Sequence, residues 1–284
     1  MNDARCLLCG STCAHRFTVR GHRVYRCAGC DLEFVHPTPS PEAIAAVYAE
    51  GYFEGGAYPD YFDSERRTSI DKARIRFDQF ARLGVTSGRL LDLGCAAGYF
   101  VDEGLARGFD AFGVEPSAQP RSRAPERARE RVVATLDDPA LPERFDVVTM
   151  WDVLEHLPDP DAAMRDITRR LSPDGWLGIV VPCIGNVNTR LAPLSWDQYK
   201  PPEHLWFWSL RALTSFLNAR GFDVVHHDVA WTRWPRWIDP GAQDRRRSRR
   251  ILRKCDGLVH RALATVLGPG IATDSIALYA RTRS

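Results

Sequence analysis

Apolar and polar positions follow different patterns in different parts of the chain. Residues 1–36 alternate short apolar pairs with turn residues and show no long period. From Arg89 onward, short apolar runs alternate with segments of helical character. The runs are the predicted strands 89–93, 111–114, 132–134, 145–150 and 176–181, and helices are predicted to start near Tyr99, Ser117 and Asp161. This alternation predicts a parallel sheet with right-handed crossovers.

Further elements are predicted on either side of this core. Ser40, Pro41 and Glu42 supply a helix N-cap, a proline at the first helical position and an early acid, so a helix is expected to run to about Glu50. Residues 64–83 place apolar side chains among charges at helical spacing, which predicts an amphipathic helix. The remaining expected segments are an irregular stretch at 183–208, a helix at 209–220, and closing strands at 222–229 and 275–281.

Two Cys-x-x-Cys pairs stand in the first 36 residues, Cys6 with Cys9 and Cys27 with Cys30. Their spacing is typical of a four-thiolate zinc site built on two knuckles. A segment this short cannot bury a core, and bound zinc would supply its folding free energy. Four unrelated thiols explain two matched pairs poorly. Two further side chains in this segment could replace a metal ligand, Cys13 and His15, but neither fits the pattern of two matched pairs.

Composition narrows the class of protein. The 284 residues are 44% hydrophobic, enough for one large α/β core with a small appended module. With 38 Lys+Arg against 36 Asp+Glu, the net charge of +2 gives no global field for nucleic acid, and no nucleic-acid partner is expected. No apolar run approaches the roughly twenty residues of a membrane span. The chain meets cysteine at once with no secretory apolar region, so a cytoplasmic protein is expected.

An acidic glycine turn follows the first predicted strand of the sheet. Asp92 ends that strand, at the carboxyl edge where ligands bind in open α/β sheets. Gly94 and Gly98 allow the backbone to approach a ligand closely. Glu115 ends the next strand, where a carboxylate can accept hydrogen bonds from both ribose hydroxyls. Asp92 would repel a pyrophosphate and favour a cofactor that carries an ammonium and a sulfonium.

These residues resemble the class I S-adenosylmethionine-dependent methyltransferases over about residues 85–284. Asp92-Leu93-Gly94-Cys95-Ala96-Ala97-Gly98 is similar to their first motif, with Ala96 in place of the middle glycine. Segment 113–117 is similar to the second motif, Leu136-Asp137 stands at the adenine position, and 145–157 is similar to the fourth motif. The resemblance implies an S-adenosylmethionine site at Asp92, Gly94, Cys95, Gly98, Glu115, Pro116, Leu136, Asp137 and Trp151.

The resemblance extends to a bacterial subgroup with a Cys-x-x-Cys head and a Glu-His-Leu-Pro-Asp-Pro signature, here 155–160. That subgroup implies methylation of a small-molecule acceptor, such as a natural product or sugar derivative, with oxygen expected as the methyl acceptor atom. The expected fold is α/β: a Rossmann-like seven-stranded sheet with helices on both faces, plus a small N-terminal zinc ribbon. The expected division is a ribbon at 1–36, a linker and lid helices at 37–84, and a methyltransferase domain at 85–284 with an insert at about 231–273.

Two histidines are candidates for the base that takes the acceptor proton. His156 follows the fourth strand at the edge of the cleft, and His204 lies in an aromatic cluster after the fifth. Each could instead be a structural histidine. The aromatic residues Trp196, Tyr199, Trp206, Phe207 and Trp208 could line the acceptor pocket or form a flap over the sheet. A set of tyrosines at 48–61 is expected to cover the cofactor as a lid.

Two other functions remain open. An RNA methyltransferase could hold nucleic acid with its ribbon and the arginine run at 245–254, although the near-neutral charge counts against it. A non-catalytic module could use the fold to bind the cofactor alone, which the acids at 92, 115 and 137 make less attractive. The run at 245–254 could also bind a carrier protein or an anionic group, or be a solvated helix face.

Overall fold

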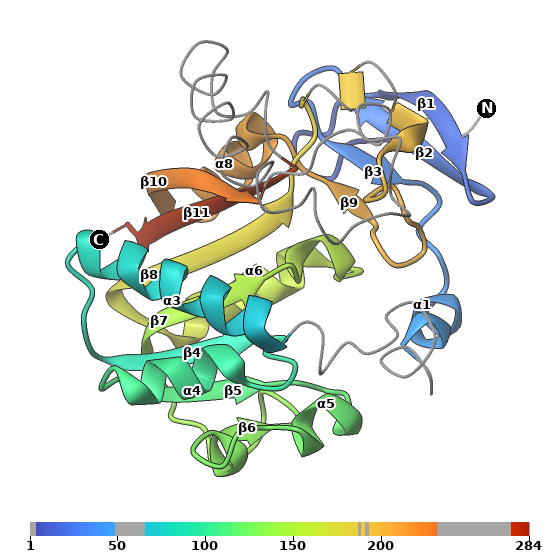
Figure 1. Cartoon of the computed structure of the whole chain (residues 1–284). Coiled ribbons are helices and arrows are strands. Elements are labelled where there is room, and N and C mark those ends of the chain that lie inside the picture. Colours follow the sequence, from blue (N-terminus) through green and yellow to red (C-terminus); the bar gives the residue numbers. More distant parts are fainter. Residues whose placement is uncertain (1–3, 49–65, 187–188, 191–192, 232–273, 284) are drawn as a thin grey trace, which may run out of the picture.

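A computed structural model describes residues 4–48, 66–186, 189–190, 193–231 and 274–283 (Figure 1). The expected lid tyrosines Tyr52, Tyr58 and Tyr61, the arginine run at 245–254 and nearly all of the insert lie outside the described residues. No helix in the described part of the chain is long and apolar enough to cross a membrane.

A seven-stranded sheet forms the centre of the molecule. Its strands are β4 (Arg89–Leu93), β5 (Asp110–Val114), β6 (Val132–Val133), β7 (Phe145–Trp151), β8 (Leu171–Pro182), β10 (Phe222–Trp231) and β11 (Ser275–Thr282). They lie in the order β10-β11-β8-β7-β4-β5-β6. The sheet is parallel from β8 to β6, and β11 runs antiparallel to both of its neighbours. The strand order reverses between β5 and β7 on either side of β4. In open α/β sheets ligands bind at the carboxyl ends of the strands at such a switch point, here at the end of β4.

Helices cover both faces of the sheet, as the sequence predicted. Successive strand residues point to opposite faces, so Leu90 packs into one core and Leu91 into the other. The first core includes side chains of α3 (Arg66–Arg82) and α4 (Tyr99–Ala106), and the second those of α6 (Pro160–Arg170) and α8 (Leu210–Asn218). Fully burying one such leucine stabilises the fold by about 1.5–3 kcal/mol.

Capping residues fix where several helices begin. Ser40 caps α1 (Pro41–Val47), because its Oγ accepts a hydrogen bond from the backbone N–H of Ala43 at 3.2 Å. Asp159 and Ser209 cap α6 and α8 in the same way, three residues before the amide that they accept from. Shorter elements complete the core: α5 (Ala118–Ser122) and the 3₁₀ turns η1 (Arg129–Arg131), η2 (Leu154–His156) and η3 (Pro193–Ser195).

A second, antiparallel sheet joins the N-terminal head to the rest of the molecule. It contains β1 (Cys13–Val19), β2 (His22–Cys27), β3 (Glu33–Val35) and β9 (Trp206–Phe207) in that order. The fourth strand therefore comes from the segment that follows β8, and Phe34 pairs with Trp206. Figure 1 shows β9 beside β3, at the upper right of the main sheet. The head thus shares its sheet with the segment that carries His204.

A buried polar network reinforces this junction. The guanidinium of Arg16 pairs with the carboxylate of Glu33, whose residue is only 1% exposed. The hydroxyl of Tyr199 donates to Glu33 Oε2 at 2.6 Å, and Arg16 Nη2 donates to the carbonyl oxygen of Thr189 at 2.9 Å. Because Glu33 would be costly to bury unpaired, this network couples the folding of the head to residues 189–199.

Candidate active site

The turn between β4 and α4 depends on two glycines, because a side chain at either position would clash with a neighbouring residue. Gly94 has a φ of +65°, and a Cβ there would lie 2.6 Å from Val153 Cγ2. Gly98 has a φ of +70° and caps α4, and a Cβ there would lie 2.9 Å from Val132 Cγ2. The backbone N–H of Gly94 donates to the carbonyl oxygen of Val114 at 2.8 Å. The turn is therefore tied to the end of β5.

Ala96 stands where the motif resemblance expects the middle glycine. Its φ is +47°, in the left-handed region that costs an ordinary residue roughly 1–2 kcal/mol. The small side chain of alanine permits this conformation, and the backbone N–H of Ala96 points to Glu115 Oε2 at 3.1 Å. The strained residue thus presents a backbone donor to the acid of the next strand.

Glu115 is positioned by backbone donors on both of its carboxylate oxygens. Oε2 accepts from Ala96 N, and Oε1 accepts from the backbone N–H of Ser117 at 2.8 Å. The residue is 8% exposed. A carboxylate oxygen has two lone pairs, so each oxygen keeps one for a ligand hydroxyl. Arg121 secures the following turn by donating to the carbonyl oxygens of Glu115 and Pro116, both at 2.6 Å.

Asp92 lies beneath the turn and is almost fully buried. The hydroxyl of Thr149, on the neighbouring strand β7, donates to Asp92 Oδ1 at 2.6 Å. Burial raises the pKa of Asp92 to about 7, although the Thr149 hydrogen bond and the charge of Arg76 oppose the rise. A cationic ligand beside Asp92 would favour its ionised form.

Arg76 is a further candidate residue of this site, and the sequence motifs did not indicate it. Its guanidinium carbon lies 4.4 Å from the centroid of the Trp151 ring, a cation–π distance. Burial lowers the pKa of Arg76, and the charges of Asp152 and Asp92 oppose that change. The sequence does contain one indication of a special role, because the charged Arg76 interrupts the apolar stripe of α3 between Ala73 and Phe80.

The other residues predicted to bind the cofactor differ in their burial and in their contacts. The Cys95 thiol is buried, packs near Gly113 and has its pKa raised by burial. Trp151 ends β7, and its Nε1 is buried without a hydrogen-bond partner among the described residues. Leu136 packs against the core, and its carbonyl oxygen accepts a hydrogen bond from Arg170. The Asp137 side chain is 99% exposed and lies 3.9 Å from Arg170.

His156 and His204, the two candidate bases, come together at the carboxyl end of β7. Their ring centroids are 4.5 Å apart and the rings are nearly perpendicular. Burial lowers the pKa of His156 to about 4 and that of His204 well below its usual value, so both are neutral at pH 7. His156 keeps a 19% exposed side chain, whereas His204 is 2% exposed. His156 is therefore the more accessible of the two.

The aromatic cluster belongs to the core. Trp196, Tyr199, Trp206, Phe207 and Trp208 are each at most 4% exposed. Tyr199 and Phe207 pack with Val24 and Val35 of the head, and Trp208 packs on Phe216 of α8. This packing favours the flap over the pocket wall among the two alternatives from the sequence.

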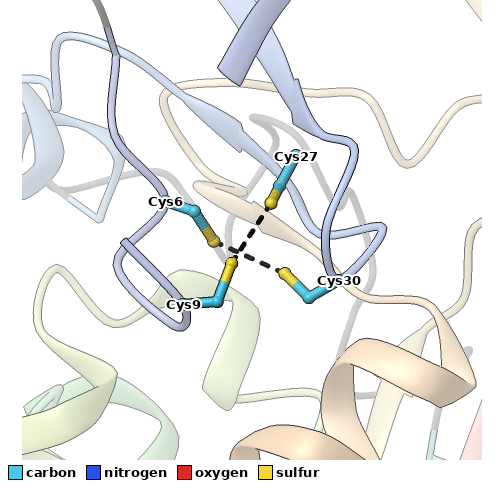
Figure 2. Close-up of side chains that lie close together, drawn as sticks. All are labelled: Cys6, Cys9, Cys27 and Cys30. Atoms are coloured by element: carbon cyan, nitrogen blue, oxygen red, sulfur yellow. Dashed lines mark hydrogen bonds between the residues drawn. The ribbon is translucent and has the colours of Figure 1, made fainter. Parts of the chain in front are cut away.

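The four cysteines of the paired motifs converge at one point in the head (Figure 2). Cys6 Sγ lies 3.4 Å from Cys30 Sγ, and Cys9 Sγ lies 3.4 Å from Cys27 Sγ. All four sulfurs lie within 4.8 Å of one another. Hydrogen bonds with Ser11 lower the pKa of Cys9 to about 6. The spare donors stay outside: the Cys13 thiol donates to the carbonyl of Ser11 at 3.5 Å, and His15 bonds Thr18.

A family model described as a methyltransferase domain matches residues 62–227, more than half of the 284 residues. The chain belongs to this family. It is an S-adenosylmethionine-dependent methyltransferase.

Curated relatives of this methyltransferase match a part of it. A ubiquinone biosynthesis O-methyltransferase of Pseudomonas savastanoi is 32% identical over 102 residues, which cover 33% of this chain and 44% of that protein. The enzyme of the same name from Methylococcus capsulatus is 30% identical over 123 residues, covering 40% and 52%. The matched part thus spans about half the length of these relatives.

Solved structures support the fold of the methyltransferase. A SAM-dependent methyltransferase from Archaeoglobus fulgidus matches with a TM-score of 0.53 at 18% identity, covering 78% of this chain and 100% of that one. The 1,6-didemethyltoxoflavin-N1-methyltransferase of Burkholderia thailandensis, solved with 1,6-didemethyltoxoflavin and S-adenosylhomocysteine, matches with a TM-score of 0.52 at 17% identity, covering 95% and 99%. At these identities the likeness concerns the fold alone.

Proposed function

We propose that this methyltransferase transfers a methyl group to an oxygen of a small-molecule acceptor. The observation that carries the proposal is the juxtaposition of an acidic glycine turn at β4 and β5 with neutral His156 at the end of β7. Relatives that match a third of the chain are named as O-methyltransferases of ubiquinone biosynthesis, which supports oxygen as the methyl acceptor atom. The net charge of +2 disfavours an RNA substrate.

The residues at the turn fit S-adenosylmethionine, which supplies an electrophilic methyl group when it is bound. Glu115 would accept hydrogen bonds from the ribose hydroxyls with the lone pairs left by Ala96 N and Ser117 N. Asp92 would favour the positive charge of the cofactor. Arg76, on the other side of Trp151, would attract its carboxylate. Gly94 and Gly98 permit the left-handed turn that packs against Val153 and Val132 and carries the backbone N–H of Ala96 to Glu115.

We also propose that His156, at the carboxyl end of β7, helps to remove the proton from the acceptor hydroxyl. Methyl transfer gains most from proximity and alignment, and a neutral group that lowers the barrier to deprotonation adds to them. His156 is neutral at pH 7 and partly exposed. His204 packs against its ring and would orient it. The hydroxyl of Tyr48 lies 2.8 Å from His156 Nδ1, which supports the proposal that the end of α1 covers this edge.

The head, in this proposal, is a zinc ribbon. In a tetrahedral site with zinc–sulfur bonds of about 2.3 Å, the sulfurs lie about 3.8 Å apart. The observed pairs at 3.4 Å and the 4.8 Å limit for the set of Cys6, Cys9, Cys27 and Cys30 fit that geometry with small adjustments. The zinc would be structural, because four thiolates leave no open position.

Methyl transfer from labelled S-adenosylmethionine tests this function. The purified enzyme is incubated with a bacterial small-molecule extract and, separately, with total RNA. We expect label in an organic-soluble product from the extract and none in RNA. Label in RNA would support the RNA methyltransferase, and cofactor binding without any transfer would support the binding module.

A further inference from the structure

Glu155, next to His156 in η2, is buried, and its carboxylate makes no hydrogen bond with the part of the chain that the structure describes. The residue is 0% exposed, and neither carboxylate oxygen has a hydrogen-bond partner in the described part of the chain. The ring nitrogen His156 Nε2 lies 3.8 Å from Glu155 Oε1. That separation is too long for a hydrogen bond. A buried carboxyl in this state is costly unless a further group satisfies it.

The two histidines present unprotonated nitrogens in the same region. His156 Nδ1 lies 2.9 Å from the carbonyl oxygen of Glu203, and His204 Nδ1 lies 3.0 Å from that of Gln198. A carbonyl oxygen only accepts, so these contacts place the proton on each Nδ1 and leave a lone pair on each Nε2. The Tyr48 hydroxyl oxygen, 2.8 Å from His156 Nδ1, then accepts from the same N–H. Histidines that bind metals are commonly oriented by such a backbone contact on the other ring nitrogen.

The three side chains converge. One ligand atom from each of Glu155, His156 and His204 can be chosen so that all lie within 4.8 Å of one another. The backbone also fixes the cluster, because Leu205 N donates to the carbonyl oxygen of Glu155 at 2.9 Å. Trp206 Nε1 donates to that of Leu157 at 2.7 Å and holds the same two segments together.

We propose that Glu155, His156 and His204 bind a divalent first-row transition-metal ion through one carboxylate oxygen and the two Nε2 atoms. Two imidazoles and one carboxylate are a donor set that suits zinc, iron or cobalt. Bond lengths of about 2.0–2.2 Å place neighbouring ligand atoms about 3–4 Å apart. The ligand atoms of the cluster, which lie within 4.8 Å of one another, therefore need to approach by up to about 1–2 Å.

The charges around the cluster favour a cation. Lys200 Nζ lies 2.6 Å from Glu203 Oε1, so this ammonium is already paired, and Asp152 is a further carboxylate that acts on Glu155. Buried carboxylates in proteins are commonly paired or coordinate a metal ion, and a dication bound here would offset the carboxylates of Glu155 and Asp152.

Three protein ligands leave coordination positions open, and this part of the inference rests on the proposed function. A hydroxyl oxygen of the acceptor bound to the ion would have its pKa lowered. Its O–H bond breaks with loss of the proton to solvent. The oxygen then bonds to the methyl carbon, and the electron pair of the carbon–sulfur bond stays on the sulfur. With the ion in place, His156 acts as a ligand, and the ion promotes the deprotonation.

Cobalt titration of the enzyme with zinc already in the head tests the site. We expect the wild type to bind one further equivalent of Co²⁺, with visible d–d bands and without thiolate-to-cobalt charge-transfer absorption. The Glu155→Gln and His204→Gln variants should bind that equivalent at least about 100-fold more weakly, beyond the usual loss from removing an outer-shell partner. His227→Gln, which changes an exposed histidine of β10, should bind it as the wild type does.

The possible results bear separately on the metal site and on its catalytic role. No further equivalent in the wild type, or unchanged Co²⁺ affinity in folded Glu155→Gln, would overturn the proposal. Affinity for S-adenosylhomocysteine shows that the variants are folded. Metal binding in an enzyme that methylates nothing would keep this site and reject the proposed function. Transfer that persists in chelator-treated enzyme lacking the second metal would reject the catalytic role of the ion.

Discussion

Thr149 donates a hydrogen bond of 2.6 Å to Asp92, and it joins the two neighbouring strands beneath the glycine turn. We expect the protonation of Asp92 to be linked to cofactor binding, with this contact as one of its controls. Burial raises the pKa of Asp92 to about 7, whereas an unfolded chain has it near 3.8. The folded protein therefore binds this proton more tightly. Asp92 thus makes the cofactor-free protein lose stability as pH rises from about 4 to 7.

Cofactor affinity should change with pH in the opposite sense. A cationic cofactor favours ionised Asp92, so we expect S-adenosylmethionine affinity to fall about tenfold for each pH unit below 7 and to level off above it. Thr149→Val removes a hydrogen bond that lowers the pKa, so it should move the midpoint upward. Thr168→Val, on an exposed position of α6, is the control. Calorimetry over pH 5–9 measures both, and a midpoint that Thr149→Val leaves unchanged would reject the linkage.

Removal of zinc should affect more than the head. We expect zinc-free protein to lose hydrogen-exchange protection in β1–β3 and also in β9, because β9 pairs with β3 and Tyr199 bonds Glu33. Affinity for S-adenosylhomocysteine should be mostly retained, since the residues that we propose to bind it lie on β4, β5 and α3. Cys13→Ala should keep one equivalent of zinc, and Cys27→Ala should lose it. Metal analysis that finds no zinc in the purified wild type would reject the ribbon.

His156→Ala should lower turnover by roughly 10²–10⁴ while cofactor affinity is preserved. Its pKa of about 4 predicts that the histidine limb of the pH–rate profile lies near pH 4, below the neutral range expected for an ordinary histidine. His204→Ala should have a smaller effect if it only orients His156, and an effect of similar size if both hold a metal. His227→Ala is the control. Near-normal turnover in both variants would reject the assignment of this edge.

Much of the fold could be predicted because its signals are local. The strands of the main sheet follow from apolar runs, and α1 begins where Ser40 and Pro41 indicated. The sequence predicted that Asp92 and Gly94 lie beside Glu115 at the ends of two neighbouring strands, and in the structure these residues lie close together. It predicted four converging cysteines for the same reason, because ligand spacing within a motif is local.

What could not be predicted depends on distant contacts. The two-residue strand β9 exists only because β3 lies beside it, and β8 starts at Leu171 rather than Trp176. Glu155 was visible as part of a signature, but its burial depends on the segment around Leu205 that folds over it. Asp137 had a position in the motif resemblance, and yet its side chain is exposed, because it lies in a turn after β6 rather than in the sheet.

The affinity of S-adenosylhomocysteine for Glu115→Ala tests the central claim most directly. The carboxylate is held by Ala96 N and Ser117 N and would bond the ribose that the product shares with S-adenosylmethionine. Loss of charge-assisted hydrogen bonds should cost about 1.5–3 kcal/mol, roughly 10- to 150-fold in the dissociation constant. Glu126→Ala, an exposed acid after α5, is the matched control. We expect calorimetry to show that loss for Glu115→Ala alone, and unchanged affinity in a folded Glu115→Ala protein would contradict the account.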